Sequence, residues 1–129
     1  MIVVAYTPDV YGEAALAHAV TEARLRRLGV VVVNATRGDA FVDERFASTE
    51  RLAELDRGLA EHGLTHEVRQ PVGVEPSEAV IDVVKEVGGT LVVVGLRHRS
   101  PVGKVLMGSV AQRILLDAPC PVLAVKPAG

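Results

Sequence analysis

The chain has 129 residues, 49% of them hydrophobic, with a formal net charge of −2 and a single cysteine. This length suits one domain with its own core, which we expect to span residues 1–129. The slightly negative charge and the 3% aromatic content argue against a basic or base-stacking surface for nucleic acid. No internal disulfide can form, and no apolar run approaches the ~20 residues of a membrane helix. Met1 leads into an apolar strand without a signal peptide, so we expect a cytoplasmic protein with neither membrane nor nucleic-acid partners.

Short apolar runs alternate along the chain with stretches of helical periodicity. Runs such as Val30–Val33 contain no alternating polar residue, which indicates strands covered on both faces, as in a parallel sheet. The predicted elements are, in order, a strand at 2–6, a helix at 13–28, a strand at Val30–Val33, a helix at 48–62, a strand at 65–70, a helix at Pro76–Val87, a strand at 91–94, a helix at 109–116 and a strand at Val122–Val125. This alternation predicts an α/β fold with right-handed crossovers.

The ends of the predicted elements carry their own signals. Gly29 follows the first helix, where we expect a residue in the left-handed conformation. Ser48 and Ser109 precede helical patterns, so we expect their hydroxyls to cap backbone N–H groups. Pro76 suits the first turn of the third helix. The strand at 65–70 is less apolar than the others, as expected at a sheet edge.

The loop at 96–108 is rich in cations and follows an apolar strand. It carries Arg97, His98, Arg99 and Lys104. The end of a central parallel strand and the start of the next helix border the crevice above the sheet, where free N–H groups and the helix dipole attract anions. The sequence therefore predicts an anion site in this crevice.

The same region has a distinctive spacing. Gly95 is followed after two residues by His98, after nine more by Gly108 and Ser109, and later by the run APCPVLAVK. This pattern resembles the carboxyl-terminal signature of the universal stress protein family, whose ATP-binding members carry glycine, two residues, glycine, nine residues, glycine and serine or threonine. His98 departs from the pattern because it stands at the second glycine.

The resemblance implies a Rossmann-like fold, similar to that of the adenine nucleotide alpha hydrolases. It is a three-layer, open twisted sheet of five parallel strands in the order 3-2-1-4-5, with helices on both faces and a ligand crevice between the ends of strands one and four. The resemblance also implies ATP or AMP as ligand, with Mg²⁺ only as the nucleotide's counter-ion and no protein metal site. The implied contact residues are Ala5, Tyr6, Thr7, Ala35, Val94, Gly95, Arg97, His98, Arg99, Gly108, Ser109 and Val110.

Two departures from the family bear on the ligand. Nucleotide-binding members have an aspartate at the position of Thr7, where it contacts the sugar side of the ligand. A threonine offers one hydroxyl where a carboxylate accepts hydrogen bonds from both ribose hydroxyls. His98 either donates a hydrogen bond to a phosphate or packs in a solvated loop, and a catalytic role is the least favoured of its readings.

No catalytic motif accompanies this pattern. The chain has no complete P-loop, Gly-x-Ser-x-Gly elbow, His-Glu-x-x-His pair or Cys-x-x-Cys. We therefore expect a nucleotide-responsive stress protein rather than an enzyme, with weak ATP hydrolysis left open. The alternative is a dimeric scaffold of the same family that has lost the nucleotide. A more remote alternative is a nucleotidyl-transferring enzyme of the same superfamily, for which a reactive-site motif is missing.

The last predicted strand suggests a partner. It is apolar throughout and occupies an edge in the implied order, where free N–H and C=O groups invite pairing with another chain. The resemblance implies a homodimer in which two copies lie antiparallel across a twofold axis. The residues that would pair are Val122, Leu123, Ala124 and Val125.

Overall fold

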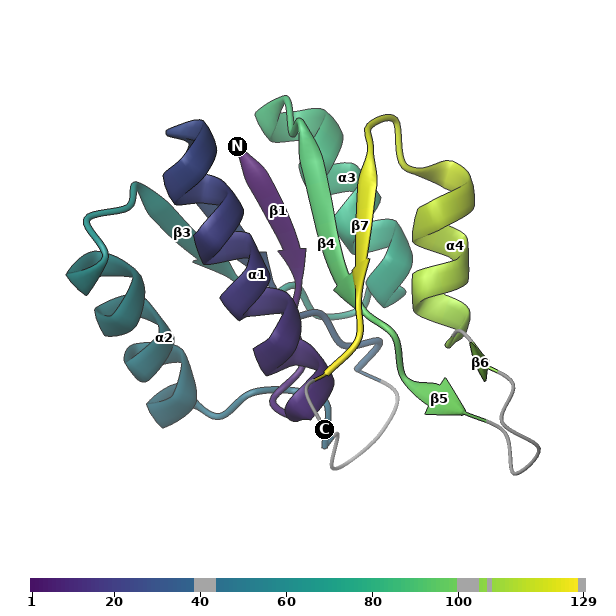
Figure 1. Ribbon diagram of the computed structural model, residues 1–129. Helices are drawn as coiled ribbons and strands as arrows, with labels where there is room; N and C mark the ends of the chain where they lie inside the picture. The colour runs from purple at the N-terminus through teal and green to yellow at the C-terminus, as the bar shows by residue number, and fades with distance from the viewer. Residues whose placement is uncertain (39–43, 100–104, 107, 128–129) are drawn as a thin grey trace.

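The computed structural model describes residues 1–38, 44–99, 105–106 and 108–127. At its centre is a five-stranded sheet in the order β3-β2-β1-β4-β7, in which all neighbouring strands are parallel (Figure 1). Counted along the chain, these strands have the predicted order 3-2-1-4-5, so the predicted fold class is confirmed. Their bounds are β1 at Ile2–Ala5, β2 at Val30–Val33, β3 at His66–Arg69, β4 at Leu91–Gly95 and β7 at Val122–Val125.

Helices cover both faces of the sheet. The helices α1 (Val10–Arg26) and α2 (Thr49–Glu61) pack on one face, and α3 (Pro76–Val87) and α4 (Ser109–Asp117) pack on the other (Figure 1). This three-layer arrangement follows from the sequence because each helix has an apolar side and each central strand has two.

The apolar strands are buried on both sides because their side chains alternate between two cores. Ile2 and Val4 of β1 pack against the α1–α2 layer, whereas Val3 packs against the α3–α4 layer. All three side chains have no solvent exposure. A polar residue at any of these positions would have to be buried, which explains why the central strands contain continuous aliphatic runs.

The ends of α1 differ from the prediction. The helix begins at Val10, three residues before the predicted start, because the Asp9 side chain caps its first turn. At the other end the left-handed residue is Arg27, with φ of 58°, and not Gly29. Gly29 is needed for another reason: a Cβ there would lie 2.8 Å from the carbonyl oxygen of Thr65.

The other helix boundaries largely agree with the prediction. Ser48 caps α2 by accepting a hydrogen bond from the Arg51 N–H at 3.1 Å, as expected. The expectation for α4 was wrong by one residue, because Gly108 occupies the capping position and Ser109 is the first helical residue. No side-chain hydrogen bond caps α4 among the described residues, so its first N–H groups are not occupied by a capping side chain.

The loop at 96–108 contains more structure than expected. Two short antiparallel strands, β5 (His98–Arg99) and β6 (Val105–Leu106), form a separate two-stranded sheet beside α4 (Figure 1). His98 and Arg99 were predicted to contact a ligand, but their side chains lie outside the described part of the chain. Lys104, the other predicted cation of this loop, lies outside it entirely.

The two edges of the sheet have different chemistry. On β3, Arg69 forms ion pairs with Glu67 at 2.6 Å and with Glu86, and His66 lies 2.8 Å from Asp56, with which it forms an ion pair when protonated, so this edge strand carries charged and polar side chains. On β7, Val122, Leu123 and Ala124 are half-buried and carry no charge. Among the described helices, none is both long and apolar enough to span a membrane.

Candidate functional site

A cleft of about 640 Å³ lies at the carboxyl ends of β1, β2 and β4. This is the predicted place, because the strand order reverses between β1 and β4 and leaves a crevice there. The structure brings ten of the twelve predicted contact residues to its walls: Ala5, Tyr6, Thr7, Ala35, Val94, Gly95, Arg97, Gly108, Ser109 and Val110. Their contacts with a ligand stay a prediction.

Other cleft residues were missed by sequence reasoning. Tyr11 and Gly12 come from the first turn of α1, Arg37 and Arg45 from the segment after β2, and Glu75 from the start of α3. Tyr11 and Gly12 were missed because the helix was expected to begin only at residue 13. The Asp9 cap was the signal that could have found them, since aspartate is favoured immediately before a helix.

Two glycines bring the start of α1 close to the ends of β1 and β4. A Cβ added at Gly12 would lie 1.7 Å from the carbonyl oxygen of Thr7, and one at Gly95 would lie 2.6 Å from the carbonyl oxygen of Tyr11. Backbone atoms cannot yield by these amounts without moving the helix, so glycine is required at both positions. This close approach forms one wall of the cleft.

Arg97 reaches across that wall to the end of β1. Its Nη2 donates to the Thr7 hydroxyl oxygen at 2.5 Å, and its Nη1 donates to Asp9 Oδ2 at 3.0 Å. The guanidinium carbon also lies 5.1 Å from the centre of the Tyr11 ring, within the range of a cation–π interaction. Because the side chain is only 18% exposed, these contacts hold the cation in a fixed place at the cleft.

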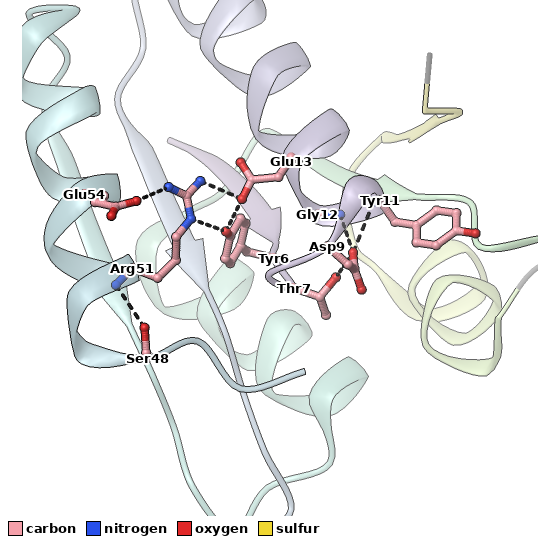
Figure 2. Close-up of polar contacts among 9 residues, drawn as sticks. All are labelled: Tyr6, Thr7, Asp9, Tyr11, Gly12, Glu13, Ser48, Arg51 and Glu54. Atoms are coloured by element: carbon pink, nitrogen blue, oxygen red, sulfur yellow. Dashed lines mark hydrogen bonds and ion pairs between the residues drawn. The ribbon is translucent and has the colours of Figure 1, made fainter. Parts of the chain in front are cut away.

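Asp9 connects Arg97 to Thr7 and to the start of α1. Its Oδ1 accepts hydrogen bonds from the N–H groups of Tyr11 and Gly12 and from the Thr7 hydroxyl, the last at 2.8 Å (Figure 2). Burial alone would raise the pKa of Asp9, but the hydrogen bonds from Gly12 and Thr7 and the charge of Arg97 lower it below its ordinary value. The carboxylate is therefore ionised at neutral pH and holds Arg97 electrostatically.

Tyr6 borders the cleft, but its hydroxyl is engaged on the α1–α2 side of the sheet. The hydroxyl donates to Glu13 Oε1, and Arg51 Nε donates to the hydroxyl oxygen at 3.0 Å (Figure 2). Burial and the Glu13 carboxylate raise the pKa of Tyr6 to about 12. Since Arg51 also pairs with Glu13 at 2.6 Å, the cluster joins β1, α1 and α2. Its geometry indicates a structural role for the Tyr6 hydroxyl.

Asn34, buried without exposure at the end of β2, fixes the opposite wall of the cleft. Its Nδ2 donates to the carbonyl oxygens of Tyr6 at 2.9 Å and Arg45 at 2.8 Å. Its Oδ1 accepts from the Ala47 N–H at 2.7 Å and from Gln70 Nε2 at 3.1 Å. All four hydrogen-bonding positions of the amide are used. The segment that carries Arg45 is thereby tied to the ends of three strands.

The third wall is the start of α4. Gly108 has φ of −61°, which any residue adopts, and an added Cβ would meet only carbons of the Arg97 side chain at 3.5 Å or more. The fold itself therefore does not require glycine at this position. A glycine that the fold does not need, at an uncapped helix start that faces a cleft, leaves room for a group to approach the backbone closely.

The charged groups at the rim are mostly cationic. Arg37 of the cleft lies 3.8 Å from Glu75, and Arg113 of α4 lies 3.8 Å from the same carboxylate. Burial opposes ionisation of Glu75, but hydrogen bonds from Ser77 and the Glu78 N–H keep its pKa below the ordinary value. Within the described ranges, no three His, Cys, Asp or Glu side chains are grouped as a metal site would need.

Comparisons with known proteins agree with this architecture. A model of the universal stress protein family matches residues 1–126. A universal stress protein of Mycolicibacterium smegmatis is 50% identical over 129 residues, which cover 100% of this chain and 99% of that protein. A universal stress protein structure from Archaeoglobus fulgidus is 32% identical with a TM-score of 0.80, covering 97% of this chain and 96% of that one.

A further structure of a universal stress protein from Archaeoglobus fulgidus is a complex with dAMP. It is 28% identical with a TM-score of 0.66, covering 97% of this chain and 95% of that one. The family match extends over nearly the whole chain, and the signature, the strand order and the cleft all agree with it. This chain therefore belongs to the universal stress protein family.

Proposed function

We propose that this chain binds an adenine nucleotide, ATP or AMP, in the cleft and acts as a dimeric regulator in the stress response. The observation that carries the proposal is the start of α4, where Gly108 leaves backbone N–H groups accessible beside a cationic wall. A phosphate is the group that such a helix start favours. A relative that binds dAMP supports the choice of an adenine nucleotide.

In the proposed complex, each wall of the cleft has a separate task. The phosphates lie against Gly108 and Ser109, the sugar lies between Thr7 and Val94, and the base lies against the backbone at Ala35. Arg97 adds positive charge on the sugar and phosphate side. The cleft volume falls within the ~300–1,000 Å³ range of small-molecule sites.

Titration calorimetry with ATP and AMP tests the proposal. The informative variant is Gly108→Ala, because its methyl group meets no backbone atom within 3.5 Å in the free protein yet occupies the space that a phosphate would take. We expect at least tenfold weaker nucleotide binding, with a loss of stability of no more than about 1 kcal/mol from the less favourable residue at the capping position. Gly58→Ala, on α2 with nothing within 4 Å of the added Cβ, is the control and should bind normally.

Salt and His98 provide two further checks of the same site. Part of the attraction is ionic, so affinity should fall as salt concentration rises. Replacing His98 by Gly restores the family spacing and should tighten ATP binding. Wild-type protein that binds neither ATP nor AMP at millimolar concentration would refute the proposal that either of these two nucleotides is the ligand.

The proposed dimer forms through β7. Its side chains Val122, Leu123 and Ala124 are half-buried in the single chain, and among the described strands β7 has a neighbour on one side only, so it is an edge of the sheet. Antiparallel pairing with a second copy would satisfy the backbone groups of this edge. Pro121 and Pro127 would end the pairing, because neither can donate a ladder hydrogen bond.

The scaffold alternative is favoured by one observation. The Thr7 hydroxyl, at the position of the family's sugar-contacting aspartate, is already engaged by Asp9 and Arg97. In that reading the dimer persists, the cleft holds no nucleotide, and the calorimetric test shows no heat. The nucleotidyl-transferring enzyme has no such supporting observation. We propose a binding protein rather than an enzyme.

A further inference from the structure

The sugar side of the cleft offers more hydrogen-bond donors than acceptors, because the Thr7 hydroxyl donates its hydrogen to Asp9 and already accepts one hydrogen bond from Arg97. The hydroxyl hydrogen of Thr7 is donated to Asp9 Oδ1 at 2.8 Å, and its oxygen accepts from Arg97 Nη2 at 2.5 Å. Asp9 Oδ1 accepts three hydrogen bonds, and Oδ2 accepts one from Arg97 at 3.0 Å. Asp9 itself is not among the residues that line the cleft.

Toward the residues that the structure describes, Arg97 uses only part of its hydrogen-bonding capacity. A guanidinium carries five N–H groups and no acceptor, and the contacts to Thr7 and Asp9 account for two of the five. The cation is held in place before any ligand arrives, by two hydrogen bonds and by the ring of Tyr11. The aliphatic part of its side chain runs along Gly108, so the guanidinium lies between the start of α4 and the end of β1.

The donors and acceptors at this wall determine which ligand group fits there. A free ribose diol has two hydroxyl hydrogens to donate, and an available carboxylate at this wall would accept them. Here the ligand meets N–H donors and a positive charge. The group that fits best is an acceptor-only, negatively charged oxygen, such as that of a phosphate ester.

We propose that the Arg97–Thr7–Asp9 arrangement makes Arg97 a specificity-determining residue that selects nucleotides with a phosphate ester on the 3′ oxygen of the sugar over nucleotides with a free ribose diol. The ester is open or cyclised to the 5′ side, because either form removes a donor and supplies phosphoryl oxygens. This inference rests on the proposed function, which places the sugar of an adenine nucleotide at Thr7.

The test compares adenine nucleotides that differ in whether the 3′ oxygen of the sugar is free, esterified, or esterified and cyclised to the 5′ side. Calorimetry is performed with AMP, adenosine 3′,5′-bisphosphate and 3′,5′-cyclic AMP on wild-type protein. We expect the two 3′-esterified ligands to bind at least about tenfold more tightly than AMP, which is the size of one charge-assisted hydrogen bond. AMP that binds as tightly as either of them overturns the inference and leaves the proposed function intact. If none of the three binds, the proposed function has failed.

Two variants and a control show whether Arg97 is the cause. Arg97→Gln should remove the preference and bring the three affinities within about threefold of one another. Thr7→Asp supplies an acceptor at the wall and should shift the preference toward AMP. Arg113→Gln removes the same charge from a residue that does not line the cleft, and should leave the order unchanged. An Arg97→Gln protein that weakens all three ligands by one common factor would show a general charge effect and overturn the inference. Thermal melting of each variant confirms folding.

Discussion

Replacing Asn34 by Ala tests whether one buried amide holds the β2 wall of the cleft. Of its four hydrogen bonds, those with the Tyr6 carbonyl and the Ala47 N–H are buried, whereas the other two are partly accessible to water. Truncation leaves two buried groups without partners, at about 1–3 kcal/mol each. We therefore expect a loss of about 2–6 kcal/mol in the free energy of unfolding, a large share of the ~5–15 kcal/mol of a typical domain.

Urea denaturation followed by circular dichroism measures this loss as a lower midpoint at an unchanged slope. Gln70→Ala is the control, because Gln70 contacts the same amide oxygen from a partly exposed position and should lose less than about 1.5 kcal/mol. A loss below 1 kcal/mol for Asn34→Ala would refute the reasoning, since water would then be replacing the amide at a site with no solvent exposure.

Asn34→Asp probes the same position through pH. A carboxylate could still accept from the Ala47 N–H but could not donate to the carbonyl oxygens of Tyr6 and Arg45, which would repel it. We expect the folded protein to favour the protonated acid and so to raise its pKa. Stability relative to wild type should therefore fall as pH rises above ~4, the ordinary value for aspartate. A difference from wild type that does not vary between pH 4 and 8 would contradict this.

Three further outcomes are expected. Gly12→Ala should cost about 3 kcal/mol or more in urea denaturation, because its Cβ would overlap the Thr7 carbonyl, whereas Gly58→Ala should be neutral or stabilising. Hydrogen bonding to the Leu64 carbonyl and to Asp56 raises the pKa of His66. The contribution of His66 to stability should therefore be full below its ordinary pKa and be lost as pH rises through the raised value. Asp56→Asn should flatten this pH dependence of the melting temperature, and an unchanged dependence would argue against the pairing. Leu123→Lys should yield monomers or poorly soluble protein, and wild-type protein that sediments as a monomer at micromolar concentration would exclude the β7 dimer.

The strands were predictable because both faces of the sheet are covered. Val30–Val33 and Leu91–Gly95 are buried along their whole length, so polar side chains are excluded from them. The resulting continuous apolar runs indicate buried parallel strands. The spacing from Gly95 to Ser109 likewise located the start of α4 within one residue.

Contacts between distant segments could not be predicted in this way. Nothing in the local pattern indicates that Arg97 reaches Asp9, 88 positions away, or that the Asn34 amide binds the Arg45 and Ala47 backbone. These hydrogen bonds depend on side-chain geometry after the sheet has formed. The requirement for glycine at position 12 could not be predicted either, because a side chain there is excluded only once α1 packs against the end of β1.

The difference between the two edges of the sheet limits how far such chains can associate. Strand addition at β3 would have to disturb the ion pairs of His66 and Arg69, and charged side chains on an edge disfavour such pairing. In the proposed dimer, two copies joined through β7 would present only the charged β3 edge at either end of the joined sheet. Growth would therefore stop at a closed pair, whereas two apolar edges would permit open-ended fibres at high concentration.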